Sequence, residues 1–262
     1  MSVHTIILAA GQGSRMKSNK AKVLQRIGGT SMLEKICHTA GAVSSDITLV
    51  VGFDKESVLE EAGNYNLNIT SSLQPKPIGT GDAVRCGLDK VQNDSKILVL
   101  YGDVPLIKKE TLQNLIESSD SGLSILTTVL DNPFGYGRVK TNDNNEALEI
   151  VEEKDATDEE RQIQEIFTGV LCGSKALIEE GLSKITNNNA AGEFYLTDLV
   201  SVINEKGIRI NTYKASNEEV KGANSKQELE QLEATYRAMQ AEDLFEKGIT
   251  ITDASRLDVR GS

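Results

Sequence analysis

Near its start the chain reads Ile6-Ile7-Leu8-Ala9-Ala10-Gly11-Gln12-Gly13-Ser14-Arg15-Met16-Lys17, an apolar run followed by two glycines and then by cations. The apolar run has the length of one buried strand. Glycines let backbone N–H groups approach an anion closely, and Arg15, Lys17, Lys20 and Lys22 supply charge that backbone dipoles lack. A strand, a glycine loop and cations in this order are suited to holding a triphosphate.

This loop is not specific by itself, because tight turns use glycine in every protein class. The dinucleotide fingerprint G-x-G-x-x-G fails, since Met16 stands where the third glycine belongs, and the pattern G-x-x-x-x-G-K-[ST] is also missing from the sequence. The alternative is that Arg15 and Lys22 are solvated surface charges.

The bulk composition indicates a globular protein, with 39% hydrophobic and 26% charged residues in a chain of 262. The net charge of −11 argues against nucleic acid as a partner, because such binders carry a basic face. No stretch approaches the roughly 20 apolar residues of a membrane span, so we expect no membrane partner. Three scattered cysteines without a C-x-x-C pair indicate reduced thiols and a cytoplasmic location.

Apolar bursts alternate with helical patterns through the first half of the chain. The strand candidates are residues 4–9, 47–51, 68–72, 96–101 and 123–129, and the helix candidates are 31–41, 55–62, 80–91 and 109–118. This alternation predicts an α/β, Rossmann-like fold with a mostly parallel central sheet and helices on both faces. Ligands in such sheets bind beyond the carboxyl ends of the strands, so the segments 11–22 and 101–103 are expected at one rim.

The second half is less regular. We expect short strands at 139–140, 147–151 and 165–172, helices at 174–184 and 194–205, and a final strand at 208–213. Residues 227–247 are rich in Glu, Leu, Gln and Ala and lack Pro and Gly, which predicts one long helix that extends out of the domain. The expected organisation is a domain at 1–226, a linker helix at 227–247 and a short segment at 248–262.

Other motifs admit a plain and a functional interpretation. Asp103 is either a turn former before proline or a carboxylate for Mg²⁺ at the carboxyl edge of the sheet, and its position favours the metal. Thr80 or Asp82 caps a helix, or the glycines around Thr80 let a flat base lie against the backbone. Gln74 either reads the edge of a base or faces water. None of these motifs is specific alone.

Their order along the chain is specific. Together they resemble the pyrophosphorylase domain of bacterial N-acetylglucosamine-1-phosphate uridylyltransferases, which implies a nucleotidyltransferase fold. The resemblance is carried by Leu8-Ala9-Ala10-Gly11-x-Gly13-x-Arg15-Met16, Lys22-Val23-Leu24, Gln74 with Gly79-Thr80-Gly81, Leu100-Tyr101-Gly102-Asp103-Val104-Pro105-Leu106, Gly135-Tyr136-Gly137-Arg138, Ile150-Val151-Glu152-x-Lys154-Asp155-Ala156-Thr157, Asn187–Ala190 with Gly192-Glu193, and Gly222-x-Asn224.

The resemblance implies Mg²⁺-dependent transfer of UMP from UTP to N-acetylglucosamine 1-phosphate, giving UDP-N-acetylglucosamine and pyrophosphate for cell-wall peptidoglycan and lipopolysaccharide precursors. Such transfer depends on positioning and charge neutralisation, so a chain with two histidines suffices. The implied site residues are Arg15 and Lys22 for catalysis; Leu8, Ala9, Ala10, Gly11, Gly13, Gln74, Gly79, Thr80 and Tyr101 for the nucleotide; Gly137, Glu152, Phe167, Tyr195 and Thr197 for the sugar; and Asp103 and Asn224 for the metal.

The chain departs from the family pattern at two places. Phe167 stands where the family carries an asparagine that contacts the sugar, and a phenyl ring cannot exchange hydrogen bonds with a hydroxyl. This leaves open a different sugar 1-phosphate, a ring that packs under the same sugar, or a catalytically silent nucleotide-sugar sensor. Residues 248–261 resemble the start of the family's β-helix acetyltransferase, but no hexapeptide repeats follow. We therefore expect a monomer without acetyltransferase activity.

Overall fold

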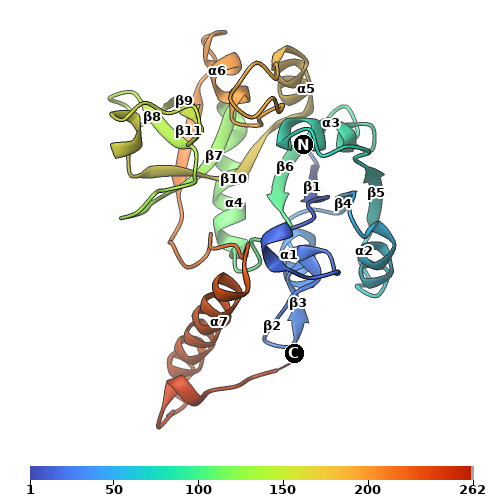
Figure 1. Cartoon of the computed structure of the whole chain (residues 1–262), viewed down its shortest axis with the longest axis vertical. Coiled ribbons are helices and arrows are strands. Elements are labelled where there is room, and N and C mark those ends of the chain that lie inside the picture. Colours follow the sequence, from blue (N-terminus) through green and yellow to red (C-terminus); the bar gives the residue numbers. More distant parts are fainter. Residues whose placement is uncertain (261–262) are drawn as a thin grey trace.

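A nine-stranded sheet with helices on both faces organises the computed structural model, which describes residues 1–260 (Figure 1). The main strands run in the order β11-β7-β10-β6-β1-β4-β5, and β8 and β9 form a hairpin beside β10. The strands are β1 (Val3–Ala9), β4 (Asp46–Val51), β5 (Ile69–Leu73), β6 (Lys96–Tyr101), β7 (Leu123–Val129), β8 (Arg138–Thr141), β9 (Ala147–Val151), β10 (Glu165–Ser174) and β11 (Ile210–Lys214).

The helices divide between the two faces of this sheet. They are α1 (Met32–Gly41), α2 (Lys55–Ala62), α3 (Thr80–Leu88), α4 (Lys109–Ser118), α5 (Lys175–Lys184), α6 (Asp198–Asn204) and α7 (Lys226–Glu246). Apolar side chains of α3, α5 and α6 form one core, and those of α1, α2 and α4 form the other. Serine side chains accept a backbone hydrogen bond at the starts of α1, α5 and α7, which explains why the helices begin there.

The predicted rim is confirmed. Strands β1 and β6 are neighbours and run parallel, with Leu8 opposite Tyr101, so the loops after both strands leave the same edge of the sheet. Most neighbours in the main strand order are parallel, as predicted. Strand β10 runs antiparallel to both β6 and β7, and β8 pairs antiparallel with β10 and with β9. A bulge interrupts the pairing of β10 with β7 between Phe167 and Leu171.

Two predictions about elements were wrong in part. The helix expected at 194–205 begins only at Asp198, because the backbone before it bonds elsewhere: Phe194 donates to the Ile78 carbonyl and accepts from Gly81 N–H, each at 2.8 Å. The helix expected at 80–91 ends at Leu88. A two-stranded hairpin, β2 (Arg26–Ile27) and β3 (Thr30–Ser31), was not predicted, since its strands are too short to show a period.

Helix α7 is a single long helix, as predicted, and it runs away from the sheet (Figure 1). Its first turns pack on the domain, where Leu232 is buried with Met16 of the glycine loop and Ile27 of β2. Glu233 accepts a hydrogen bond from Gly28 N–H at 2.9 Å. The chain then turns back along α7 through a 3₁₀ turn at Ala254–Arg256.

The last two residues of the predicted segment 248–262, Gly261 and Ser262, lie outside the described residues. In the part of the chain that the structure describes, no helix has both the length and the apolar character needed to cross a membrane.

Candidate functional site

Two adjoining cavities lie at the rim formed by the ends of β1 and β6. The first, of about 300 Å³, is lined by Leu8, Ala9, Ala10, Gly11, Lys22, Val23, Gln74, Pro77, Gly79, Thr80, Ala83, Tyr101, Asp103 and Glu193. The second, of about 520 Å³, is lined by Arg15, Lys22, Thr80, Tyr101, Asp103, Val104, Gly135, Tyr136, Gly137, Glu152, Phe167, Thr168, Gly169, Glu193, Tyr195, Thr197, Val220, Gly222 and Asn224. Every predicted site residue except Gly13 therefore lines one or both cavities.

The glycine loop bends sharply at Gly13, whose φ is +63°. A Cβ built there would lie 2.7 Å from Lys22 Cβ, so only glycine lets the loop pack this closely against Lys22. Gly13 thus shapes the loop from behind the cavity wall. Met16 is buried beneath the loop, and Arg15 beside it is exposed at the rim of the second cavity.

The two predicted metal ligands, Asp103 and Asn224, both contact the ammonium group of Lys22. Lys22 Nζ donates to Asp103 Oδ2 at 2.5 Å and to Asn224 Oδ1 at 2.9 Å. The Asn224 amide is fixed in this orientation because its backbone N–H and Nδ2 both donate to Glu228 Oε2, at 2.8 and 3.3 Å. A carboxylate and an amide oxygen that already bracket a cation form a donor set that fits Mg²⁺.

Glu228 was not recognised as part of the site from sequence, although a local signal was available. Ser225 and Glu228 form a capping box at the start of α7: Glu228 N–H donates to Ser225 Oγ at 3.1 Å, and Ser225 Oγ lies 3.2 Å from Glu228 Oε1. The residue just before this box is Asn224. The helix cap therefore also sets the position of the predicted metal ligand.

Gln74 is buried, so the interpretation in which it faces water is wrong. Its Nε2 donates to the Gly79 carbonyl at 3.0 Å and to Asp82 Oδ2 at 2.9 Å. Both amide protons are therefore used within the protein, and Oε1 is left to accept from a ligand N–H. Asp82, which the sequence offered as a cap of the helix, orients this amide instead, and no side chain caps the start of α3.

The loop after β5 is tied to the loop before α6. Gly79 has φ +127°, and a Cβ there would lie 2.3 Å from the Phe194 carbonyl oxygen. Thr80 Oγ1 accepts from Leu196 N–H at 3.1 Å, so Thr80 is bonded across the site and does not cap α3. These contacts join the walls of the two cavities.

Tyr101 stands between the cavities at the end of β6. Its ring occupies the space beside Gly169, where φ is +89° and a Cβ would lie 2.3 Å from the ring. Burial raises the pKa of Tyr101 above its ordinary value, so the hydroxyl stays protonated and can donate a hydrogen bond at neutral pH.

A half-buried carboxylate, that of Glu152, lines the second cavity. Thr197 Oγ1 donates to Glu152 Oε1 at 2.9 Å, and burial raises the pKa of Glu152 from its ordinary value. Gly137 lies beside Glu152. A Cβ at position 137 would lie 2.8 Å from Ile150 Cγ2, so the packing there favours glycine. Burial, together with nearby carboxylates, raises the pKa of Tyr195 to about 12. This wall offers several groups that can exchange hydrogen bonds with hydroxyls.

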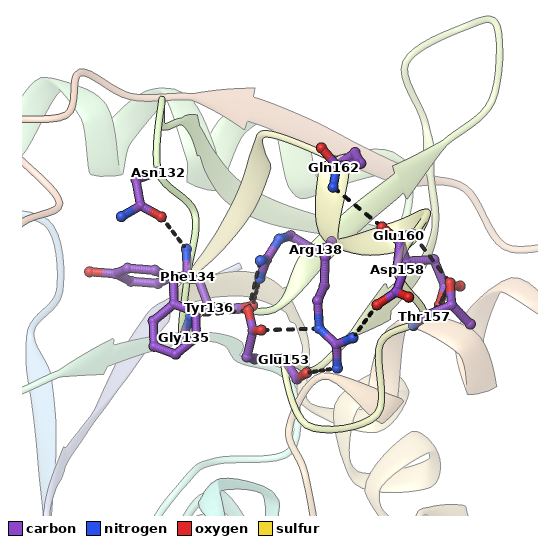
Figure 2. A network of polar contacts seen from close by, with 11 residues as sticks. Asn132, Phe134, Gly135, Tyr136, Arg138, Glu153, Thr157, Asp158, Glu160 and Gln162 are labelled. Carbon is purple, nitrogen blue, oxygen red and sulfur yellow. Dashed lines mark hydrogen bonds and ion pairs between the residues drawn. The ribbon is translucent and has the colours of Figure 1, made fainter.

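An ion-pair network fixes that wall from behind (Figure 2). Arg138 is 2% exposed and donates through Nη2 to Glu153 Oε2 at 2.7 Å, and the same oxygen accepts from Gly135 N–H at 3.1 Å. Arg161 Nε donates to Glu153 Oε1 at 3.2 Å. The sequence predicted a role for neither side chain, since Arg138 stands there only within a motif of the resemblance and Glu153 is not part of one. A signal was present in the sequence, because Arg138 and Glu153 carry opposite charges and directly follow the predicted site residues Gly137 and Glu152.

Phe167 is almost fully buried and contributes its ring to the second cavity and to the apolar core. Its backbone N–H donates to the Gly137 carbonyl at 2.9 Å, so the segment is well anchored. The side chain offers no hydrogen-bond partner to a ligand at this point of the wall.

Known proteins resemble this chain in sequence and in fold. Residues 5–179 match the family described as the MobA-like NTP transferase domain. The protein "Bifunctional protein GlmU" of Methylococcus capsulatus is 44% identical over 264 residues, which cover 100% of this chain and 57% of that protein. The same-named proteins of a Psychrobacter species and of Francisella philomiragia are each 42% identical and are covered to 56% and 58%. The chain spans somewhat more than half the length of these curated relatives.

A solved structure from Bacillus anthracis, described as a glucose-1-phosphate thymidylyltransferase, has the same fold. It superposes with a TM-score of 0.70 over 97% of this chain and 99% of that one, at 19% sequence identity. The family match covers well over half of the chain, from the first strand through α5. The chain therefore belongs to the family of MobA-like NTP transferase domains.

Proposed function

We propose that this protein is a sugar-1-phosphate uridylyltransferase that transfers UMP from UTP to N-acetylglucosamine 1-phosphate, with release of pyrophosphate. The observation that carries the proposal is the convergence of the nucleotide, phosphate and sugar residues on two cavities that share Lys22 and Asp103. The similarity to GlmU proteins, which extends over this chain and over somewhat more than half of those proteins, supports the choice of uridine and of the amino sugar.

In this proposal the first cavity holds the nucleotide. Gln74 Oε1 accepts the imide N–H of uracil, because its amide protons are already bonded to Gly79 and Asp82. Cytosine presents an acceptor at that position and is disfavoured. The backbone from Leu8 to Gly11 lies against the base and ribose at the end of β1.

The phosphates lie where the cavities meet. Lys22 and Arg15 offset the charge of the triphosphate and of the departing pyrophosphate, and the sugar phosphate oxygen attacks the α-phosphorus in line. Asp103 and Asn224 would hold Mg²⁺, which when bound supplies further neutralisation of phosphate charge. No protein nucleophile takes part in the reaction.

The second cavity holds the amino sugar in this assignment. Glu152 accepts from sugar hydroxyls, and Tyr195, Thr197 and the backbone at Gly137 complete the polar wall. The catalytic unit is residues 1–226, followed by α7 as a linker helix and by the short segment 248–262. The free thiols Cys37, Cys86 and Cys172 suit a cytoplasmic enzyme.

The test is pyrophosphate release from UTP and Mg²⁺ with a panel of sugar 1-phosphates. We expect release with N-acetylglucosamine 1-phosphate, and we expect CTP in place of UTP to support at most a small fraction of that rate. The absence of release with every sugar on the panel would remove the uridylyltransferase proposal.

Phe167 favours a second candidate, a uridylyltransferase for a different sugar 1-phosphate. A wall without a hydrogen-bond partner selects less strongly for a hydroxyl at that position of the sugar. Values of kcat/KM for the 1-phosphates of N-acetylglucosamine, glucose and galactosamine decide between the two candidates. A nucleotide-sugar sensor is the least supported alternative, because it has no need of the aligned Asp103 and Asn224 oxygens.

A further inference from the structure

The proposed metal site is occupied by a charge that belongs to the chain. The Lys22 ammonium lies 2.5 Å from Asp103 Oδ2 and 2.9 Å from Asn224 Oδ1, the same two oxygens that would hold a divalent cation. The side chains of Lys22 and Asp103 are only 16% and 14% exposed. Water therefore screens this ion pair weakly.

We propose that Lys22 competes with the divalent cation for Asp103 and Asn224, so that the free protein binds metal weakly and a bound triphosphate opens the site by attracting Lys22. The inference rests on the proposed function and adds to it an order of binding. Mg²⁺ binds oxygens at about 2.0–2.1 Å, so a metal on these two oxygens and the Lys22 ammonium on the same oxygens would lie close together. Two cations at this spacing would also repel each other.

Lys22 is the movable part of this arrangement, because other hydrogen bonds hold the Asn224 oxygen and Asp103 packs closely against Gly222. Glu228 fixes the Asn224 amide through two hydrogen bonds, and Ser225 fixes Glu228 at the start of α7. Asp103 is backed by Gly222, where a Cβ would lie 3.0 Å from the Asp103 carbonyl oxygen. The donor set is therefore preformed and can exchange one cation for another.

The Lys22 side chain can also reach the first cavity, where the nucleotide is proposed to bind. Lys22 lines both cavities, whereas Arg15 lines only the second, so a small swing of the Lys22 side chain serves the phosphates of a nucleotide in the first. Without the lysine, the carboxylates Asp103 and Glu193 of the shared wall, together with Glu152 in the second cavity, would make the junction of the cavities acidic. Such a wall repels a triphosphate and attracts a divalent cation.

The direct test measures the affinity of the nucleotide-free protein for Mn²⁺ alone. The concentration of unbound Mn²⁺ is read from its electron paramagnetic resonance signal. We expect Lys22→Ala to bind Mn²⁺ about tenfold more tightly than the parent, which corresponds to a lysine-free state populated at about 10%. Lys20→Ala removes the same charge from an exposed position of the same loop and should change the affinity by less than about twofold. Asp103→Ala should abolish the binding.

Equal or weaker Mn²⁺ binding by Lys22→Ala would overturn the inference, and so would binding that survives Asp103→Ala. These outcomes are independent of the proposed function, which is judged on the unmodified protein by pyrophosphate release. If the parent is active and Lys22→Ala gains no affinity for Mn²⁺, only the proposed order of binding falls and the proposed function stands. If no variant binds Mn²⁺ and the parent releases no pyrophosphate, both proposals fall.

A second measurement needs no substitution and so does not depend on a variant that folds. In protein labelled with ¹⁵N-lysine, the ammonium of Lys22 should give an exchange-protected NMR signal, recognised by its proximity to the Asn224 amide. We expect this signal to disappear or shift as Mg²⁺ is added to saturation. A signal that stays unchanged with the metal bound would show that Lys22 and the metal do not share the site.

Discussion

The two cavities of this protein are built from different materials. One side of the first, called the backbone wall below, is formed by the carboxyl end of β1, the glycine loop after it and Gly79, and the side chains of Gln74, Lys22 and Asp103 complete its lining. One side of the second, called the side-chain wall below, presents Glu152, Tyr195 and Thr197 from the end of β9 and the loop before α6, and the Arg138–Glu153 ion pair lies next to it.

This difference teaches where each kind of specificity resides. A backbone wall is sensitive to glycine replacement, which alters φ or adds a Cβ, and it is indifferent to most other substitutions. A side-chain wall can be altered one group at a time, and Phe167 is such a group. Lys22 and Asp103 belong to both walls, so changes there should affect both substrates.

The largest effect is expected at the junction of the cavities. Asp103→Ala removes a carboxylate shared by both walls, and we expect kcat to fall by about 10³-fold while the far-UV circular dichroism stays unchanged. Asp120→Ala is a suitable control, because Asp120 pairs with Lys96 on an exposed surface away from both cavities. A loss of kcat below about tenfold would mean that Asp103 is not central to the reaction.

The backbone wall is tested by Gly13→Ala. The added Cβ meets Lys22 at 2.7 Å in a left-handed conformation, so the loop must shift, and we expect kcat/KM for UTP to fall by about 30-fold. Gly207→Ala is a matched control with φ +69° and open space around the added Cβ. It should lower the free energy of unfolding by about 1 kcal/mol and leave kcat/KM unchanged. Similar kinetic losses in both variants would show that backbone strain alone is responsible.

The side-chain wall is tested by Glu153→Ala. It leaves the Arg138 guanidinium, which is 2% exposed, without its carboxylate, and we expect the free energy of unfolding to fall by about 3 kcal/mol. The KM for the sugar 1-phosphate should rise about tenfold while the KM for UTP stays within about twofold. Glu149→Ala breaks an exposed pair with Lys140 on the same hairpin and should cost less than about 1 kcal/mol. A parallel rise of both KM values after Glu153→Ala would contradict the division into two walls.

The elements of the first cavity could be predicted because their signals are local. The run from Ile6 to Ala9 is apolar throughout, as a strand between two parallel neighbours must be, and it forms the centre of the sheet. The strand ending at Tyr101 carries the same signal. Alternation of strands and helices then places both loops at one rim, so adjacency in space followed from order in sequence.

The supports of the second cavity could not be predicted in the same way. Arg138 meets Glu153 only because β8 pairs with β9 in a particular register, with Arg138 opposite Val151. Between Lys140 and Thr141 an irregularity shifts this register by one residue. Residues 194–196 were expected in a helix because nothing local shows that their backbone bonds to residues 78–81. Contacts between distant segments override local propensity at these points.

A smaller effect is expected from Phe167→Asn. The substitution restores an amide to the wall of the second cavity, and we expect the preference for N-acetylglucosamine 1-phosphate over glucose 1-phosphate, as a ratio of kcat/KM, to rise by about tenfold. The KM for UTP should not change. Phe134→Asn introduces the same amide at a ring that is 76% exposed and controls for the loss of an aromatic side chain. An unchanged sugar preference would mean that the ring at position 167 packs harmlessly under the sugar.

The smallest effect is expected from the acidity of the second wall, where burial and the nearby Asp155 raise the pKa of Asp198 from 3.8 to about 6. The native state then holds a proton that the unfolded chain releases between these two values, so the stability of the parent falls as pH rises from about 4 to 6. Asp198→Asn removes this titration and should gain about 1 kcal/mol over the parent at pH 7, after allowance for solvent screening, and almost nothing at pH 4. Urea unfolding at the two pH values measures the difference, with Asp143→Asn as a control at an exposed carboxylate. If Asp198→Asn raises the free energy of unfolding by the same amount at both pH values, the charge on Asp198 does not destabilise the parent.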